Sequence, residues 1–212
     1  MYPTPERTAR LADGAMHSLG LGFALAGAVA LTVWAAFNAG TGQAAALAVY
    51  GVALVATFAA SAIYHMTPWH GLRPVLRRID HAAIYLKIAG TYTPLVVMVG
   101  SALGYGVLAI VWALAVFGMV RKLFYWQVPG RFGPVLYLVM GWMSVLVIWP
   151  AIPVLPGLAL ALIAAGGLTY SAGVVFYAWD GLRFGMAIWH GFVVTASALF
   201  FAAIAVSAAA LA

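Results

Sequence analysis

The sequence predicts an all-α membrane protein, a seven-transmembrane helix bundle with its N-terminus inside and its C-terminus outside. Three observations support this fold class. The chain is 66% hydrophobic and only 7% charged, whereas a water-soluble domain is about 25% charged. It contains seven apolar stretches long enough to cross a hydrocarbon core as helices. Its Lys and Arg residues are confined to alternate connecting segments, which is typical of a multi-pass membrane protein.

The predicted spans use nearly all of the 212 residues. In chain order they lie near residues 15–37, 44–66, 79–99, 103–120, 133–149, 157–179 and 185–211. Their uninterrupted apolar runs favour helices, because the strands of a membrane barrel alternate apolar and polar residues. Little sequence remains beyond the spans and their loops, so we expect a single domain over residues 1–212.

Positive charge sets the predicted orientation. Nine of the ten Lys and Arg residues lie in four segments: the tail (Arg7, Arg10), 67–78 (Arg73, Arg77, Arg78), 121–132 (Arg121, Lys122, Arg131) and 180–184 (Arg183). The segments between them, near 38–43, 100–103 and 150–156, have none. Because positive charge resists translocation, the basic segments are predicted to be cytoplasmic. The net charge of +6 then faces anionic lipid head groups, so membrane lipids and not nucleic acid are the expected partners.

Several ionisable side chains lie in or beside the spans, all in the predicted cytoplasmic half. His17 is near the start of the first span, His65 ends the second, Asp80 and His81 open the third, and His190 lies in the seventh. An ionisable residue in a membrane span is costly, by at least about 2.5–3.5 kcal/mol for a central charge, and usually faces the bundle interior. We therefore expect His65, Asp80 and His190 to form a site.

Residue spacing and type point to a metal. Ser61 and His65 are four residues apart and share a helix face, as do Asp13 and His17. Since the chain has no cysteine, its available ligands are imidazole and carboxylate, which suit Zn²⁺. Three such ligands would leave a position at which a water molecule could be activated.

One basic residue, Lys87, lies inside a predicted span. Its side chain could extend towards the cytoplasmic interface or pair with a carboxylate. A structural role is the expectation from the sequence.

Long motifs resemble those of the hemolysin III branch of the progestin and adipoQ receptor family. Ser61-Ala-Ile-Tyr-His65 resembles the family's S-x-x-x-H motif, and residues 80–94 resemble its D-H-x-x-I-Y-x-x-I-A-G-T-Y-T-P signature. Residues 187–193 resemble its last-span motif and residues 17–20 its first-span motif. The resemblance covers essentially the whole chain.

This resemblance implies a seven-helix bundle with a zinc ion near the cytoplasmic face. The family's ligands are one histidine of the second span and two of the seventh, and an aspartate of the third span contacts the zinc-bound water. Carried over to this sequence, His65 and His190 are metal ligands, while Asp80 and its accompanying Ser61 are catalytic. The family is related to membrane alkaline ceramidases, which hydrolyse an amide at a comparable site.

The chain departs from the family pattern at one ligand. The seventh-span motif H-x-x-x-H begins here with Met186, and a thioether is a soft ligand that suits Cu(I) better than Zn²⁺. The first-span motif also has Asp13 where related sequences usually have Asn. Three outcomes stay open: Asp80 is the third ligand, His17 is the third ligand, or the site holds no zinc.

The leading hypothesis is a zinc-dependent hydrolase of a lipid amide or ester in the bacterial inner (plasma) membrane, with its site at the cytoplasmic side. Asp80 would act as general base and Ser61 would hydrogen-bond the oxyanion or the attacking water. The main alternative is a non-enzymatic, receptor-like or lipid-sensing protein with a degenerate metal site. Cytolysis by pore formation is a third hypothesis. The sequence indicates a lipid-like substrate or ligand without identifying it, and it predicts no oligomeric state.

Overall fold

The computed structural model describes residues 6–125 and 132–212, and every regular element in these ranges is a helix. The elements are α1 (Arg7–Asn38), α2 (Thr41–Met66), the 3₁₀ turn η1 (His70–Leu72), α3 (Arg73–Val99), α4 (Ala102–Phe124), α5 (Phe132–Trp142), α6 (Val145–Ala151), α7 (Gly157–Tyr177) and α8 (Gly185–Ala210). Arg131, part of the third predicted cytoplasmic segment, lies outside the described residues. The all-α prediction is confirmed for the part described.

Six of these helices, α1 to α4, α7 and α8, are long and apolar enough to cross a membrane. They match the predicted spans at the corresponding positions, although α1 begins at Arg7, well before residue 15. Large apolar side chains cover the outside of the bundle; Phe37 and Trp149 are each 83% exposed. A surface of this kind is stable in contact with lipid. The chain is therefore an integral, multi-pass membrane protein.

The fifth predicted span, 133–149, differs from the prediction because it is divided into α5 and α6. The two helices meet at Met143–Ser144, where the Ser144 amide bonds to the Gly141 carbonyl instead of continuing the α-helical ladder. The Tyr92 hydroxyl of α3 donates to the carbonyls of Met140 (2.7 Å) and Gly141 (2.8 Å). A tertiary contact thus satisfies carbonyls at the break, as backbone groups in an apolar medium require.

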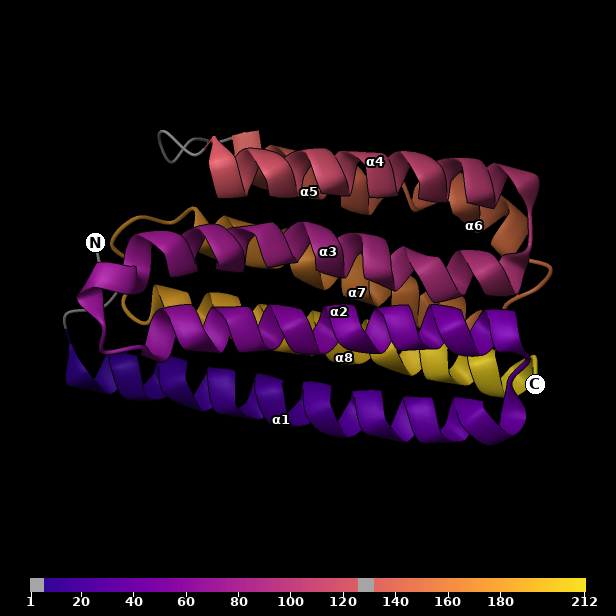
Figure 1. Cartoon of the computed structure of the whole chain (residues 1–212), viewed down its shortest axis with the longest axis horizontal. Helices are drawn as coiled ribbons and strands as arrows, with labels where there is room; N and C mark the ends of the chain where they lie inside the picture. The colour runs from indigo at the N-terminus through magenta and orange to yellow at the C-terminus, as the bar shows by residue number, and fades with distance from the viewer. Residues whose placement is uncertain (1–5, 126–131) are drawn as a thin grey trace.

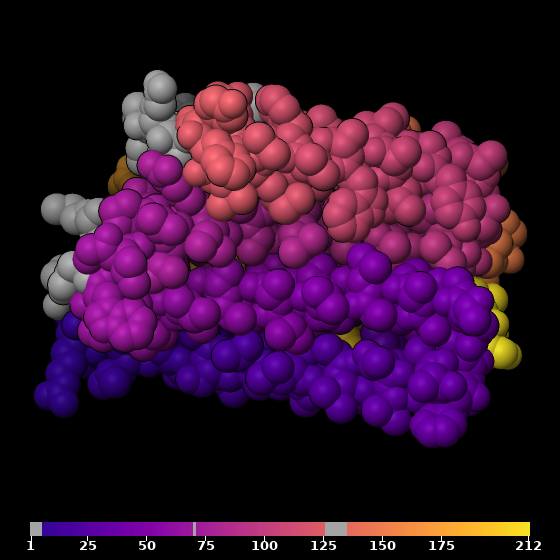
Figure 2. All heavy atoms as spheres, viewed as in Figure 1, coloured from indigo at the N-terminus to yellow at the C-terminus, as the bar shows by residue number. Residues whose placement is uncertain are grey.

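The helices lie side by side along the long axis, and the two ends of the chain are at opposite ends of the bundle (Figure 1). Consecutive helices pack together from α1 to α4, and α7 packs on α8. Helix α8 also packs on α1, which brings the first and last helices together. On the face shown in Figure 2, the side chains of α1 to α4 cover the molecule and leave little of α8 visible. Side chains of α1, α2 and α8 can therefore meet in the interior.

Local sequence signals set the direction of the central helices. Helix α3 has Pro74 in its first turn, where a backbone N–H has no partner within the helix, so its absence in proline costs nothing. The helix ends at Gly100, which is in the left-handed region (φ 67°). Ser101 then caps α4 by accepting a hydrogen bond from the Gly104 amide at 3.0 Å. The chain thus reverses direction within two residues.

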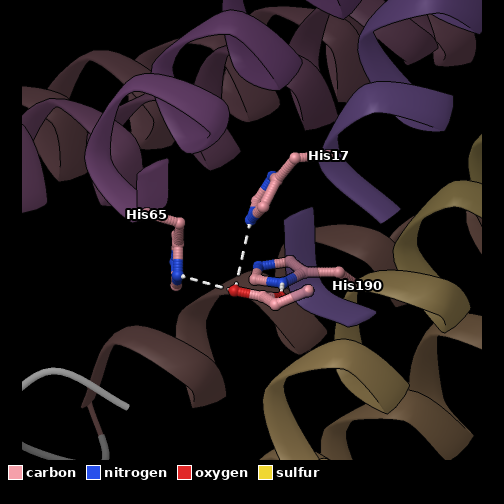
Figure 3. A group of neighbouring side chains, drawn as sticks. His17, His65 and His190 are labelled. Carbon is pink, nitrogen blue, oxygen red and sulfur yellow. Dashed lines mark hydrogen bonds and ion pairs between the residues drawn. The ribbon is translucent and has the colours of Figure 1, made fainter. Parts of the chain in front are cut away.

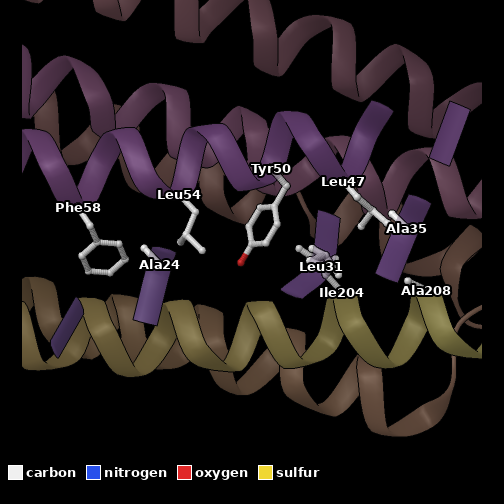
Figure 4. Close-up of a cluster of buried hydrophobic side chains, with 9 residues drawn as sticks. All are labelled: Ala24, Leu31, Ala35, Leu47, Tyr50, Leu54, Phe58, Ile204 and Ala208. Atoms are coloured by element: carbon white, nitrogen blue, oxygen red, sulfur yellow. The ribbon is translucent and has the colours of Figure 1, made fainter. Parts of the chain in front are cut away.

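Close packing keeps α1, α2 and α8 in register. One buried cluster between these helices contains Ala24, Leu31, Ala35, Leu47, Tyr50, Leu54, Phe58, Ile204 and Ala208 (Figure 4). Glycines allow the closest approaches. A Cβ atom on Gly20 of α1 would lie 2.5 Å from the Phe58 ring of α2. On the other side of α2, a Cβ atom on Gly90 of α3 would lie 2.5 Å from the Ala53 Cβ atom. Small residues of this kind let membrane helices approach one another closely.

Candidate metal centre

Helix α1 buries one face along much of its length, and this face carries two polar residues. Its buried positions are Ala9, Asp13, His17, Gly20, Ala24, Leu31 and Ala35. The spacings of three, four and seven are those of a single helical face. Asp13 and His17 therefore point into the bundle near the start of α1, and only 5% and 3% of their surfaces are exposed.

Two further histidines reach the same place from other helices. His65 lies in the last turn of α2 and His190 in the second turn of α8. They are 3% and 7% exposed. Because α2 ends at the end of the bundle where α1 and α8 begin (Figure 1), side chains 173 residues apart in sequence (His17 to His190) become neighbours.

The Asp13 carboxylate lies at the centre of this group. His190 Nδ1 donates a 2.6 Å hydrogen bond to Asp13 Oδ1. His65 Nδ1 and His17 Nε2 lie 3.3 Å and 3.6 Å from Asp13 Oδ2. Figure 3 shows the three imidazole rings arranged around the carboxylate, with dashed lines to it. A single buried negative charge thus attracts all three rings.

The imidazole rings are also close to one another. The ring centroid of His17 is 4.9 Å from that of His65 and 4.3 Å from that of His190, and the His65 and His190 centroids are 4.6 Å apart. One potential ligand atom from each of the four residues can be chosen so that all lie within 4.8 Å of one another. The structure therefore contains a buried cluster, Asp13, His17, His65 and His190, that can hold a metal ion.

The donor set of this cluster fits a transition metal. Imidazole suits zinc, copper, iron and nickel, and a carboxylate hydrogen-bonded to a ligating histidine is a common orienting partner. The bond from His190 Nδ1 to Asp13 leaves Nε2 of the same ring to face a metal. Deprotonated carboxylate and neutral imidazole are the states that bind metal.

Asp80 lies outside the four-residue cluster. Its Oδ2 atom is 3.4 Å from Nδ1 of His81, whose Nδ1 also lies 2.9 Å from the Arg77 carbonyl oxygen. Ser61 and His65 are both within electrostatic reach of the Asp80 carboxylate. The Asp80 carboxylate therefore lies beside the cluster, next to its member His65 and to Ser61 on the same helix as His65.

Of the sequence-predicted ligands, the structure brings His65, His190 and His17 together. Met186 is half-buried, one helical turn before His190.

Asp13 is the member that the sequence-based site lacks. The signal for it was its spacing of four residues from His17, which places both on one helix face. Related sequences usually have Asn at this position, so the family pattern does not indicate a carboxylate here. The side chain lies 3.6 Å or less from three histidines, a proximity that arises only when α1, α2 and α8 pack.

The fold and the cluster together define an integral membrane helix bundle with a buried candidate metal centre near one end. A family model described as "Haemolysin-III related" matches residues 8–201. The chain belongs to this haemolysin III family. The match includes all four cluster residues and all but the ends of the described chain.

Individual relatives agree with this assignment. The chain is 34% identical over 192 residues to "Hemolysin-3" of Bacillus cereus, covering 90% of this chain and 88% of the relative. It is 34% identical to the "Hemolysin-3 homolog" of Bacillus subtilis (strain 168), covering 90% of each. It is 33% identical over 165 residues to the human "Monocyte to macrophage differentiation factor", covering 74% of this chain and 67% of the relative.

Proposed function

We propose that this protein is a zinc-dependent hydrolase of a lipid amide or ester in the bacterial inner membrane. One observation supports the proposal above others: three imidazoles and a carboxylate from three helices lie within 4.8 Å of one another, buried in an apolar bundle. Imidazoles arranged around an ion are common in zinc hydrolases. A site enclosed by lipid-facing helices favours a substrate that enters from the membrane, such as an acyl lipid.

The proposal includes a topology with seven spans and the N-terminus in the cytoplasm. In this reading α5 and α6 together make the fifth crossing. The apolar stretch Val135–Ala151 is shorter than the six long helices, and it is interrupted at Ser144. The basic residues Arg10, Arg73 and Arg183 belong to the same end of the bundle as the cluster. Retention of positive charge in the cytoplasm would place the cluster at the cytoplasmic side.

Within the cluster, His17, His65 and His190 would hold the zinc ion. Asp13 would fix the orientation of the His190 ring through its 2.6 Å hydrogen bond. Zinc bound here would supply a Lewis acid for the substrate carbonyl and would lower the pKa of a water molecule. Holding the metal with three protein ligands would leave room for substrate and water.

Asp80 would move the proton in this reaction. It lies near Ser61 and His65 and outside the ligand cluster, so its carboxylate can accept a proton from the attacking water and deliver it to the leaving group. Ser61, one turn before His65 on α2, would donate a hydrogen bond to the oxyanion. Positioned proton transfer of this kind contributes about 10²–10⁴-fold to rate.

A second candidate is a non-enzymatic, lipid-sensing membrane protein. The observation that favours it is that the Asp13 carboxylate lies within 3.6 Å of a ring nitrogen of each histidine, a contact that a purely structural polar cluster would also make. Met186 in place of a histidine supports the same reading. Cytolysis, which the names of the Bacillus relatives indicate for those proteins, is a third candidate.

The test is to measure metal content and hydrolysis in the same detergent-purified samples. We expect about one zinc per chain in the wild type, loss of zinc and of hydrolysis of fluorescent acyl-amide and acyl-ester lipids in His65→Ala, and retained zinc without hydrolysis in Asp80→Asn. His81→Ala, which removes a histidine outside the cluster, should keep its zinc. Hydrolysis unchanged in His65→Ala would refute the enzyme proposal. Zinc bound only by Met186→His would favour the lipid-sensing reading.

A further inference from the structure

Lys87 carries an amine into the interior of the bundle. The residue lies in the middle of α3 and is 7% exposed. Its Nζ atom donates to the Ser197 hydroxyl of α8 at 2.5 Å. The same atom lies 4.7 Å from the ring centre of Phe58 in α2 and 5.2 Å from that of Tyr170 in α7. Side chains from three other helices, α2, α7 and α8, therefore surround this amine.

Lys87 and the residues around it, Ser197, Phe58 and Tyr170, form a second layer, here called the Lys87 layer. It repeats the positions of the metal-cluster layer two helical turns further along. Ser197 is seven residues after His190, Phe58 is seven before His65, and Lys87 is seven after Asp80. Seven residues are almost two helical turns, or about 10.5 Å of rise, and return to the same helix face. The Lys87 layer is thus deeper in the bundle than the metal cluster and separate from it.

None of the chain's acidic side chains, all of which are described, pairs with Lys87. Glu6 pairs with Arg183, Asp13 with three histidines and Asp80 with His81, and Asp180 is exposed. A charged amine in a membrane interior is costly unless it has a counter-charge. Of the two alternatives that the sequence left for Lys87, pairing with a carboxylate of the chain is therefore not found among the described residues.

The hydrogen bonds around Lys87 are incomplete. Ser197 donates its own proton to the Val193 carbonyl, and its oxygen accepts from Lys87 and contacts the Tyr170 hydroxyl at 3.1 Å. An ammonium group has three N–H donors, and Ser197 is its hydrogen-bond acceptor within the described chain. Two donors of Lys87 thus lack an acceptor, and aromatic faces give them only a weak electrostatic substitute.

A second buried donor supports the same conclusion. Tyr50 is 1% exposed and its hydroxyl has no hydrogen-bond partner in the part of the chain described. Figure 4 shows this hydroxyl pointing away from α2 into the space facing α8, with its tip leaning towards the Phe58 end of the cluster. Buried hydroxyls are nearly always paired in stable structures. The bundle interior thus holds a second donor that has no acceptor among the described residues.

We propose that the Lys87 layer is a binding site for a monovalent anion, either chloride or the carboxylate of an acyl chain. Both offer what the layer lacks: one negative charge and several acceptor positions without donors. Lys87 would pair with the anion through the N–H donors that Ser197 leaves without an acceptor. The site requires no metal and no turnover, so it is independent of the proposed hydrolase.

The test compares anions in chelator-treated, detergent-purified protein. One arm replaces sodium gluconate with sodium chloride at constant ionic strength. The other adds decanoate to gluconate buffer, with decan-1-ol as the uncharged match. We expect at least one of the two anions to raise the midpoint of thermal unfolding in a saturable way, since a ligand of the folded state stabilises it. Decan-1-ol should give a much smaller shift.

Two lysine variants decide whether Lys87 carries the effect. The chain's other lysine, Lys122, lies at the end of α4, so Lys122→Met is the matched control and should keep the wild-type shift. Lys87→Met should lose it. Equal shifts in Lys87→Met and the wild type, or no anion effect on the wild type, would overturn the proposal. If Lys87→Met does not fold, anomalous diffraction from wild-type crystals soaked in bromide and, separately, in 2-bromodecanoate replaces it. A bromine signal beside Nζ is expected in at least one of the two, and its absence from both would refute the site.

Discussion

Asp13 shows how one side chain can organise a site. Its carboxylate contacts three imidazoles that come from its own helix and two others. In a medium that excludes water, such contacts are stronger than on a surface. The carboxylate therefore serves two purposes in the proposed centre: it aligns the His190 ring and it offsets part of the charge of a bound cation.

Replacing Asp13 by Asn tests this residue directly. The amide keeps the shape of the side chain but loses its negative charge, so we expect zinc affinity to fall by about 10–100-fold, as for other orienting carboxylates. Competition titration with a chromophoric chelator measures the change. Asp180→Asn removes the same charge at an exposed position and should leave the affinity unaltered. Equal affinities in the wild type and Asp13→Asn would show that the carboxylate plays no part in metal binding.

At the scale of the helix, close approach between α2 and α3 positions His65 relative to Asp80. Gly90 makes this approach possible, because its hypothetical Cβ atom would lie 2.5 Å from that of Ala53. A Cβ atom cannot rotate away from its backbone, so one of the two helices would have to move.

We therefore expect Gly90→Ala to destabilise the protein by about 1–3 kcal/mol, the usual cost of overpacking, and to reduce metal binding. Gly22→Ala in α1 is the control, since nothing lies within 4 Å of its hypothetical Cβ atom. That variant should be neutral or slightly stabilised through better helix propensity. Denaturant-dependent unfolding in mixed micelles measures both, and equal stability of the two variants would contradict the packing argument.

The junction of α5 and α6 depends on a single hydroxyl of another helix. Tyr92→Phe keeps the ring and removes the donor to the Met140 and Gly141 carbonyls. We expect a loss of about 1–3 kcal/mol for leaving buried acceptors unpaired, with faster hydrogen exchange in α5 and α6. Tyr105→Phe, at a tyrosine that is 47% exposed, should have little effect. Unchanged exchange in Tyr92→Phe would mean that the break is maintained in another way.

These elements also show what the sequence could and could not reveal. Six of the spans were predictable because long apolar windows are a local property of the chain. The break in the fifth predicted span was not, since the residue that contacts it, Tyr92, lies some fifty residues earlier. Within the site, His65 and His190 were predictable from motif and depth, whereas the central place of Asp13 follows from the packing of three helices.

For the molecule as a whole, a bound metal would join α1, α2 and α8 and so stabilise the bundle. We expect a chelator to lower the unfolding midpoint of zinc-loaded protein; the loss is about 4 kcal/mol when free zinc had been 1,000 times its Kd. This loss should shrink as the pH falls through the range in which imidazoles gain a proton, because protonated histidine cannot bind metal. A midpoint that is indifferent to chelator at neutral pH would contradict the expectation.

The pairing of the first helix with the last has a consequence for how the molecule is made. Asp13 and His17 leave the ribosome early. His190 follows 173 residues after His17, when helices α1 to α7 have already been synthesised. A nascent chain can therefore assemble its histidine cluster only after α8 has been synthesised. Metal uptake would then report that α8 is in place, and a truncated product lacking α8 would stay metal-free and open to proteolytic clearance.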